Sequence, residues 1–426
     1  MEIAGYAVQS LFQTTSSSLL FRATRDADGR AVILKTPRVE HPGPRERARY
    51  QREHHLLHRL RGTPGVPDTL GLALLQERPV LVLEDVGGTS LAEHVGQPLE
   101  PAWLLSLALP LTATLAEVHR RGVLHKDIKP ANLLRTEDGR VWLIDFGMAT
   151  SHQLEHVEAL PSGLVEGTLA YMSPEQSGRM NRAVDYRTDL YSLGVVLYQL
   201  LTGQLPFQGR DALEWFHAHI AQVPVPPAER RPGVPPALSA LVLKLLGKSA
   251  EQRYQSAEGL WADLERCQDG LRRGEAVDFP LGERDVPARF QPPQHLYGRQ
   301  AELGALLEGF ERVAREARPE WVLVSGYSGI GKSSLVHELH KPILLRRGVF
   351  LSGKFNELQR EVPYATLAHT LRGLVRQMLT GSEAELAAWR QRLLEAFDGE
   401  GQVLLGLVPQ LAQVVGPLPT APELPL

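Results

Sequence analysis

The sequence has very little cysteine, because Cys267 stands alone among 426 residues. A single cysteine excludes a disulfide within the chain and a zinc site built from cysteines, and it is typical of proteins in a reducing compartment. The N-terminus lacks the basic segment and apolar stretch of a signal peptide. The longest apolar run, residues 104–115, contains Pro110 and is too short to span a bilayer. We therefore expect a cytoplasmic protein without a membrane span.

An excess of charge of either sign is also absent. Lys and Arg number 46 and Asp and Glu number 49, which gives a formal net charge of −3. Because the basic residues are scattered, neither a nucleic acid nor an anionic membrane surface is a predicted partner. A hydrophobic content of 43% is enough for buried cores, and the length allows two or three domains.

The spacing of apolar residues changes along the chain. Residues 6–35 alternate as strands do, whereas residues 101–121 and 185–201 repeat with the period of a helix. A polar segment with four prolines, residues 274–293, has the composition of a linker. The predicted parts are a first domain at 1–272, a linker at 273–294 and a second domain at 295–426.

Short motifs in a fixed order carry the chemistry of the first domain. They are Val-Ile-Leu-Lys at 32–35, Leu-His-Lys-Asp-Ile-Lys-Pro-Ala-Asn at 124–132, Asp-Phe-Gly at 145–147, Gly-Thr at 167–168 and Ser-Pro-Glu at 173–175. This ordered set resembles serine/threonine protein kinases over roughly residues 5–270. The resemblance implies an α+β bilobal fold, with a small strand-rich lobe before a larger helical one, and phosphoryl transfer from ATP to a protein hydroxyl.

The resemblance gives individual residues roles in that reaction. Asp127 would accept the hydroxyl proton, and Lys129 would contact the transferred phosphate. Asn132 and Asp145 offer the hard oxygen ligands that suit Mg²⁺. Lys35 would hold the α- and β-phosphates, because the transition state needs charge neutralisation more than covalent chemistry.

Other residues would position these groups. Glu53 is the better candidate for an ion pair with Lys35, and Glu46 is its rival. The segment from Glu84 to Val86 would form the hinge whose backbone meets adenine. The remaining implied contacts are a brace of the catalytic loop by Asp189 and an ion pair of Glu175 with Arg253.

Two features depart from the kinase pattern, the segment 13–18 and Lys126. Residues 13–18 read Gln-Thr-Thr-Ser-Ser-Ser where the family usually has three glycines that allow close approach of the backbone to phosphate. We therefore expect weak ATP binding, which glycine at Thr15 and Ser18 would tighten. Lys126 replaces an arginine that, in kinases switched by loop phosphorylation, clamps the loop phosphate with two bonds.

The second domain contains a phosphate-binding motif. Residues 326–333 read Gly-Tyr-Ser-Gly-Ile-Gly-Lys-Ser, between an apolar segment at 321–325 that is predicted as a strand and a predicted helix. Backbone amides would cradle phosphates, Lys332 would reach the terminal ones, and Ser333 would bind Mg²⁺. The predicted nucleotide-binding residues are Gly326, Gly329, Gly331, Lys332 and Ser333.

A wider resemblance covers essentially the whole chain. The run from Ser173 to Asp189, the motif at 326–333, and the segments 352–356 and 362–364 look like parts of bacterial hybrid signalling proteins. Those proteins join a serine/threonine kinase to an AAA-type ATPase module, followed by sensor domains and a histidine kinase. In that comparison this chain ends inside the ATPase module.

The second domain is therefore expected to be an incomplete α/β P-loop NTPase domain. After Lys332 the only aspartate is Asp398, at the end of a predicted helix, so no strand-borne acid completes the Mg²⁺ site. The chain would then be a fragment or a truncated paralogue. Its apolar residues at 403–408 would be left exposed.

The sequence favours an ATP- and Mg²⁺-dependent serine/threonine protein kinase of bacterial signal transduction, with a second nucleotide site at the P-loop. Its partners would be a protein substrate carrying Ser or Thr, and downstream signalling modules or a histidine kinase. The alternative is a pseudokinase-like module that binds nucleotide and docks partners with little phosphotransfer. The altered loop at 13–18 supports this alternative, whereas Lys35, Asp127, Asn132 and Asp145 oppose it.

Overall fold

The computed structural model describes most of the chain. The described residues are 3–15, 17–75, 78–151, 169–178, 183–275, 277–287, 298–346, 348–353, 355, 364–379, 383–397, 401–416 and 418. The chain forms two compact units. The first unit consists of Met1–Gln208 and Gln222–His295, and the second of Gly209–Ala221 and Leu296–Leu426.

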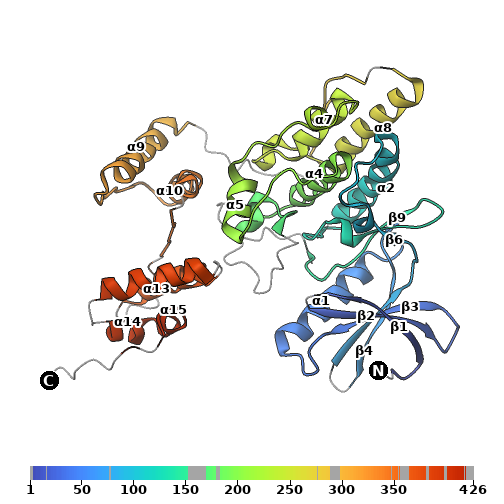
Figure 1. Ribbon diagram of the computed structural model, residues 1–426, viewed down its shortest axis with the longest axis horizontal. Helices are drawn as coiled ribbons and strands as arrows, with labels where there is room; N and C mark the ends of the chain where they lie inside the picture. The colour runs from blue at the N-terminus through green and yellow to red at the C-terminus, as the bar shows by residue number, and fades with distance from the viewer. Residues whose placement is uncertain are drawn as a thin grey trace. The chain divides into compact units, whose positions relative to one another are not determined.

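The first unit begins with a small lobe built on a five-stranded antiparallel sheet, drawn in blue in Figure 1. The strands lie in the order β1-β2-β3-β5-β4. Their bounds are β1 (Tyr6–Thr14), β2 (Ser18–Arg25), β3 (Ala31–Pro37), β4 (Thr69–Leu75) and β5 (Arg78–Glu84), and helix α1 (Pro44–Arg59) follows β3. Alternation along the strands buries Ala23, Val32 and Val82, each at most 1% exposed. The strand pattern predicted for residues 6–35 is confirmed.

The β2–β3 hairpin sets the register that positions the cleft. Arg25 N donates to Arg30 O at 2.9 Å and Gly29 N donates to Arg25 O at 2.8 Å. Gly29 has a φ of +72°, in the left-handed region that favours glycine. This turn places Leu20 of β2 opposite Lys35 of β3.

The larger lobe of the first unit is mainly helical. Its helices are α2 (Pro101–Arg120), α4 (Arg187–Thr202), α6 (Pro227–Arg230), α7 (Pro236–Leu245) and α8 (Ala257–Arg273). Its short strands are β6 (Thr89–Ser90), β7 (Val123–Leu124), β8 (Leu133–Arg135), β9 (Val141–Leu143) and β10 (Thr150–Ser151). Every residue of α4 from Arg187 to Leu201 is buried, so this predicted helix forms the centre of the lobe. Gly194 permits its close packing on α7, because a Cβ there would lie 2.6 Å from Leu245 Cβ.

Among the described residues, α2 alone has the length and composition of a membrane-crossing helix. Half of its most apolar window is nevertheless buried inside the unit. It packs along α8, and its buried residues include Leu104, Leu111 and Leu115. These contacts are those of the core helix of a folded domain.

The described residues of the second unit form helices. They are α5 (Ala212–Ala221), α9 (Gln300–Glu316), α10 (Lys332–His337), α11 (His340–Leu345), α12 (Ala365–Met378), α13 (Glu383–Phe397), α14 (Gly401–Leu407) and α15 (Ala412–Val415). An apolar cluster joins α12 to the last two helices through Val375, Met378, Val408 and Val414. This cluster is the core of the unit's C-terminal part.

The strand predicted at 321–325 is wrong, because residues 321–327 have no regular secondary structure. Trp321 is 98% exposed and Leu323 is 92% exposed. A parallel strand needs neighbours to pair its backbone N–H and C=O groups, and none of the described residues of this unit forms a strand beside it.

The prediction that residues 403–408 are left exposed is wrong for most of them. Val408 is 1% exposed, and Leu404, Leu405 and Leu407 pack against the apolar cluster. Val403, which is 69% exposed, is the residue of this run that does face solvent. The reason is that α14 turns one apolar face toward this cluster, so these side chains find partners inside the unit.

Candidate active site

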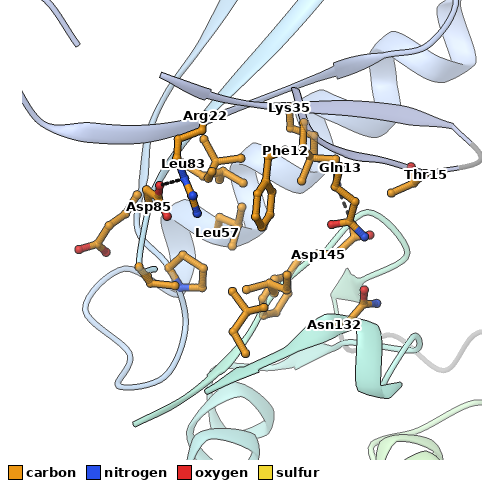
Figure 2. Close-up of a pocket in the computed structure, with 18 of the residues that line it drawn as sticks. Phe12, Gln13, Thr15, Arg22, Lys35, Leu57, Leu83, Asp85, Asn132 and Asp145 are labelled. Atoms are coloured by element: carbon orange, nitrogen blue, oxygen red, sulfur yellow. Dashed lines mark hydrogen bonds and ion pairs between the residues drawn. The ribbon is translucent and has the colours of Figure 1, made fainter. Parts of the chain in front are cut away.

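A cleft in the first unit lies between the five-stranded sheet and the helical lobe (Figure 2). It encloses about 730 Å³, open solvent included. Lys35, Asn132 and Asp145 lie toward one end, and Arg22 and Asp85 lie at the other. The lining residues are Phe12, Gln13, Thr15, Leu20, Arg22, Ile33, Lys35, Glu53, Leu57, Pro67, Leu83, Glu84, Asp85, Val86, Gly87, Asn132, Leu134, Ile144, Asp145 and Phe146.

Lys35 holds two carboxylates at the polar end of the cleft. Its Nζ lies 2.6 Å from Glu53 Oε1 and 2.6 Å from Asp145 Oδ1. Lys35 comes from β3 and Glu53 from α1, both in the small lobe, whereas Asp145 follows β9 of the larger lobe. The Lys35–Asp145 ion pair therefore joins the two lobes. Glu46 instead pairs with Arg49 at 3.5 Å, so Glu53 is the glutamate that meets Lys35.

Burial and ion pairing compete over the charges of this cluster. Burial opposes the charge of Lys35, but the carboxylates of Asp145 and Glu53 outweigh it and raise the pKa of Lys35. Burial also opposes ionisation of Asp145, yet the charge of Lys35 holds the pKa of Asp145 below its ordinary value. For Glu53, burial outweighs the lysine and raises the pKa. Lys35 and Asp145 are therefore both charged at neutral pH.

Gly147 lies next to this cluster, and its lack of a side chain makes room for the charged groups. Its N–H donates to Asp145 Oδ1 at 3.2 Å. A Cβ at this position would lie 3.1 Å from Asp145 Oδ1, 3.4 Å from Lys35 Nζ and 3.5 Å from Glu53 Oε2. A side chain at this position would crowd the Asp145 carboxylate and lie in contact with Lys35 and Glu53.

Asp127, Lys129 and Asn132 form a second polar cluster between β7 and β8. Lys129 Nζ lies 3.0 and 2.8 Å from the two carboxylate oxygens of Asp127. Asn132 Nδ2 donates to Asp127 Oδ2 at 2.9 Å and to its main-chain oxygen at 2.8 Å. Burial raises the pKa of Asp127, against the lowering effect of the charge on Lys129.

The carboxylate of Asp189, at the start of α4, fixes the backbone that carries Asp127. Asp189 Oδ2 accepts from His125 N at 2.9 Å and Oδ1 accepts from Lys126 N at 2.8 Å. Lys126 has a φ of +65°, a conformation that residues with a Cβ rarely adopt. Because Asp189 is fully buried, these two bonds hold the strained backbone without competition from water.

A buried ion pair anchors the Ser-Pro-Glu segment to the helical lobe. Arg253 Nη1 and Nη2 donate to Glu175 Oε1 and Oε2 at 2.7 and 2.9 Å. Thr188 Oγ1 donates to Glu175 Oε1 at 2.7 Å. The paired geometry adds directional specificity to the charge attraction.

Comparison with known protein families shows which family this arrangement of residues belongs to. The family model described as "Protein kinase domain" matches residues 14–263, which is more than half of the chain. The chain belongs to the protein kinase family. A second family model, "AAA ATPase domain", matches residues 295–423. The chain is thus a bilobal kinase domain followed by an AAA-type module.

Curated relatives share the kinase domain. "Hybrid signal transduction histidine kinase G" of Dictyostelium discoideum is 30% identical over 411 residues, 74% of this chain and 12% of that protein. "Probable serine/threonine-protein kinase SCO3848" of Streptomyces coelicolor is 39% identical over 194 residues, 45% of this chain and 28% of that protein. "Serine/threonine-protein kinase PknB" of Mycobacterium tuberculosis is 37% identical over 194 residues, 45% of this chain and 31% of that protein. The chain spans less than a third of the length of each of these relatives.

The kinase cleft brings together most of the predicted site residues. Those that line it are Lys35, Glu53, Glu84, Val86, Asn132 and Asp145. Asp127 and Lys129 are bonded to Asn132 or to each other beside it. The predicted Gly-Thr motif at 167–168 and Asp398 lie outside the described residues.

Sequence reasoning missed an ion pair at the other end of the kinase cleft. Arg22 Nε donates to Asp85 Oδ2 at 2.7 Å, and the Arg22 guanidinium lies 4.8 Å from the centre of the Phe12 ring (Figure 2). The pair joins β2 to the hinge. The one available signal was strand alternation, which puts Arg22 on the same face of β2 as Leu20.

In the second unit, the lysine of the phosphate-binding motif is hydrogen bonded to the backbone of the motif itself. Lys332 Nζ donates to the main-chain oxygens of Gly326 and Tyr327 at 2.7 and 2.8 Å. The three glycines of the motif have φ values of +154°, +81° and +94°, which favour glycine. Ser333 lies exposed in the first turn of α10.

Proposed function

We propose that this chain is an ATP- and Mg²⁺-dependent serine/threonine protein kinase of a signalling protein. The observation that carries the proposal is the double ion pair of Lys35 with Glu53 and Asp145, in a cleft that Asn132 also lines. Asp127 lies next to that cleft and is bonded to Asn132. These groups supply the proton acceptor and the positive charge that phosphoryl transfer requires.

Membership of the protein kinase family implies ATP and a divalent cation, and the donor set fits Mg²⁺. Asn132 and Asp145 would hold it, because amide and carboxylate oxygens are the hard ligands that Mg²⁺ takes. Among the described residues, no group of three or more His, Cys, Asp and Glu side chains is arranged for a metal. Two protein ligands suit Mg²⁺, which keeps waters and phosphate oxygens as its other ligands. When bound, the cation would neutralise charge on the phosphates.

Each residue of the cleft has its own role in the proposed phosphoryl transfer. Lys35 binds the α- and β-phosphates, and the backbone from Glu84 to Val86 binds adenine. Asp127 orients the substrate hydroxyl and accepts its proton, and the upward shift of its pKa by burial favours proton transfer to it. Lys129 contacts the phosphoryl group in transfer, from a position within 3.0 Å of Asp127 Oδ1.

A nucleotide-binding module with little phosphotransfer is the second candidate, and one observation favours it. In kinases with a glycine-rich loop, backbone amides approach the phosphates. Here the amides of Ser17 and Ser18 donate instead to Thr15 Oγ1, at 3.4 and 2.9 Å. The ion pairs of Lys35 favour the active kinase over this candidate.

We place a second nucleotide site at the P-loop and place the protein in cytoplasmic signalling. The amides of Gly326, Gly329 and Gly331 and the amine of Lys332 would bind phosphates, and Ser333 would bind Mg²⁺. The partners would be a protein substrate carrying Ser or Thr, and further signalling modules or a histidine kinase. The name of the hybrid histidine kinase relative supports this setting.

Labelling of a generic basic protein by γ-labelled ATP and Mg²⁺ tests the kinase proposal in the full chain. Asp127→Asn and Asp145→Asn should each lower the labelling about 10²-fold or more, because charge stabilisation of the transition state is lost. Asp138→Asn, in the exposed β8–β9 turn, is the matched control and should label as wild type does. Wild-type labelling no greater than that of Asp145→Asn would make the nucleotide-binding module the better assignment.

A further inference from the structure

Side chains, rather than glycines, close the turn between β1 and β2. Thr15 N donates to Ser18 O at 2.9 Å. Thr15 Oγ1 accepts from Ser18 N at 2.9 Å and from Ser17 N at 3.4 Å. Arg38 N, just beyond β3, donates to Ser17 O at 3.1 Å, which ties the turn to the neighbouring strand. Figure 2 shows Gln13 and Thr15 of this hairpin at the roof of the cleft near Lys35.

Two side chains of α1 reach this turn. The hydroxyls of Ser18 and Tyr50 lie 2.8 Å apart, and these residues are 2% and 0% exposed. Arg49 Nη1 donates to Ser17 Oγ at 3.0 Å. Both bonds come from the helical turn that precedes Glu53, the residue paired with Lys35.

Breaking the hydrogen bond between Ser18 and Tyr50 costs free energy. Burial raises the pKa of Tyr50, so its hydroxyl keeps its proton and can hydrogen bond. Loss of one hydroxyl leaves the other buried without a partner, because water does not reach it. Since Tyr50 and Glu53 are three residues apart on α1, they move together with the helix. A displacement of α1 that separates Glu53 from Lys35 therefore also disrupts the turn.

We propose that Tyr50 and Arg49 are positioning residues that couple the β1–β2 turn to α1. The conformation of the turn over the nucleotide and the Lys35–Glu53 ion pair then form a single cooperative unit. A loop of glycines can move independently of the helix, whereas this turn cannot. The inference rests on the proposed nucleotide-binding function of the cleft.

A double-mutant cycle on the full chain measures this coupling. Tyr50→Phe and Ser18→Ala should each weaken binding of Mg²⁺–ADP, followed by calorimetry, by about two- to ten-fold, the range for one lost hydrogen bond. The double variant should bind no more weakly than either single variant, because both changes remove the same bond. Losses that add would contradict the coupling.

Hydrogen exchange without nucleotide gives an independent readout. In Tyr50→Phe, and again in Ser18→Ala, the amides of Ser17 and Ser18 and those of α1 should exchange faster together. Tyr198→Phe is the matched control: Tyr198 is 0% exposed and its hydroxyl donates to Val225 O at 2.8 Å in the helical lobe. That control should change neither segment. Faster exchange at the turn with α1 unchanged would overturn the proposal.

The two readouts separate this inference from the function on which it rests. A wild-type chain that binds no Mg²⁺–ADP would contradict the proposed function. The exchange measurement would still decide the coupling, because it compares free proteins. Joint protection of the turn and α1 that both variants lose would support the coupling in that case too.

Discussion

Asp127 is a buried carboxylate that lies against the amine of Lys129. The lysine lowers the pKa of this carboxylate, while burial, the larger effect, raises it. If Asp127 accepts the substrate proton, transfer must fall off as the pH drops through its pKa, since the protonated acid cannot act as a base. The acid limb of the pH–rate profile therefore reports the environment of this residue.

Removal of Lys129 should move the acid limb of the pH–rate profile to higher pH. In Lys129→Met the pKa of Asp127 rises further, because the opposing charge is gone while burial remains. The measurement is kcat at saturating ATP across the acid range, compared with wild type, whatever the residual rate. Lys126→Met, a change of the same size at a lysine that is not among the main causes of the Asp127 pKa shift, should leave the limb in place. An unchanged limb in Lys129→Met would show that another group limits the rate at low pH.

At the scale of elements, the β1–β2 hairpin changes the expectation drawn from its composition. The absence of glycine at 13–18 predicts that glycine at Thr15 would tighten nucleotide binding. The structure supplies a reason for the opposite result, because the Thr15 hydroxyl closes the turn through Ser17 N and Ser18 N. Glycine there would remove these bonds and add backbone freedom that binding must then restrict.

We therefore predict that Thr15→Gly weakens ATP binding about two- to ten-fold, the range for loss of a hydrogen bond. Thr15→Ser should bind nearly as wild type does, because serine keeps the hydroxyl oxygen. Calorimetry of the full chain with Mg²⁺–ATP separates the two variants. Tighter binding by Thr15→Gly would restore the first expectation, in which the missing glycines limit the site.

The elements differ in how far the sequence predicts them. The strands of residues 6–35 and the helices α2 and α4 follow from apolar periodicity, because each buries one face or its whole surface within a single unit. The segment 321–325 has an equally apolar pattern but forms no strand, because strand pairing depends on neighbours that periodicity does not report.

The candidate site shows the same division. Lys35, Asp127 and Asp145 belong to short motifs whose order can be recognised from the sequence. The Arg22–Asp85 ion pair and the Ser18–Tyr50 bond join residues 63 and 32 positions apart, and no local pattern marks them. Contacts of this kind depend on the register of the sheet and the placement of α1, which only the folded lobe provides.

At the scale of the whole molecule, the chain carries two predicted nucleotide sites of different completeness. The kinase cleft has its charged groups bonded to one another in one unit. At the P-loop, Lys332 bonds to its own loop, and among the described residues of the second unit no strand carries an acid toward it. Hydrolysis in a P-loop enzyme depends on such an acid to hold Mg²⁺, as well as on the lysine.

We therefore predict that the P-loop of this chain binds nucleotide weakly and hydrolyses none. The measurement is phosphate release by the full chain in an Asp127→Asn background, which silences transfer at the kinase cleft, with and without Lys332→Ala. The two proteins should release phosphate at the same background rate, while Lys332→Ala should lower any residual nucleotide binding, because the lysine is the one charged group of the motif. Turnover that disappears with Lys332→Ala would show a working ATPase, and the acid that completes it would then have to come from a part of the chain that the structure does not describe or from a second molecule.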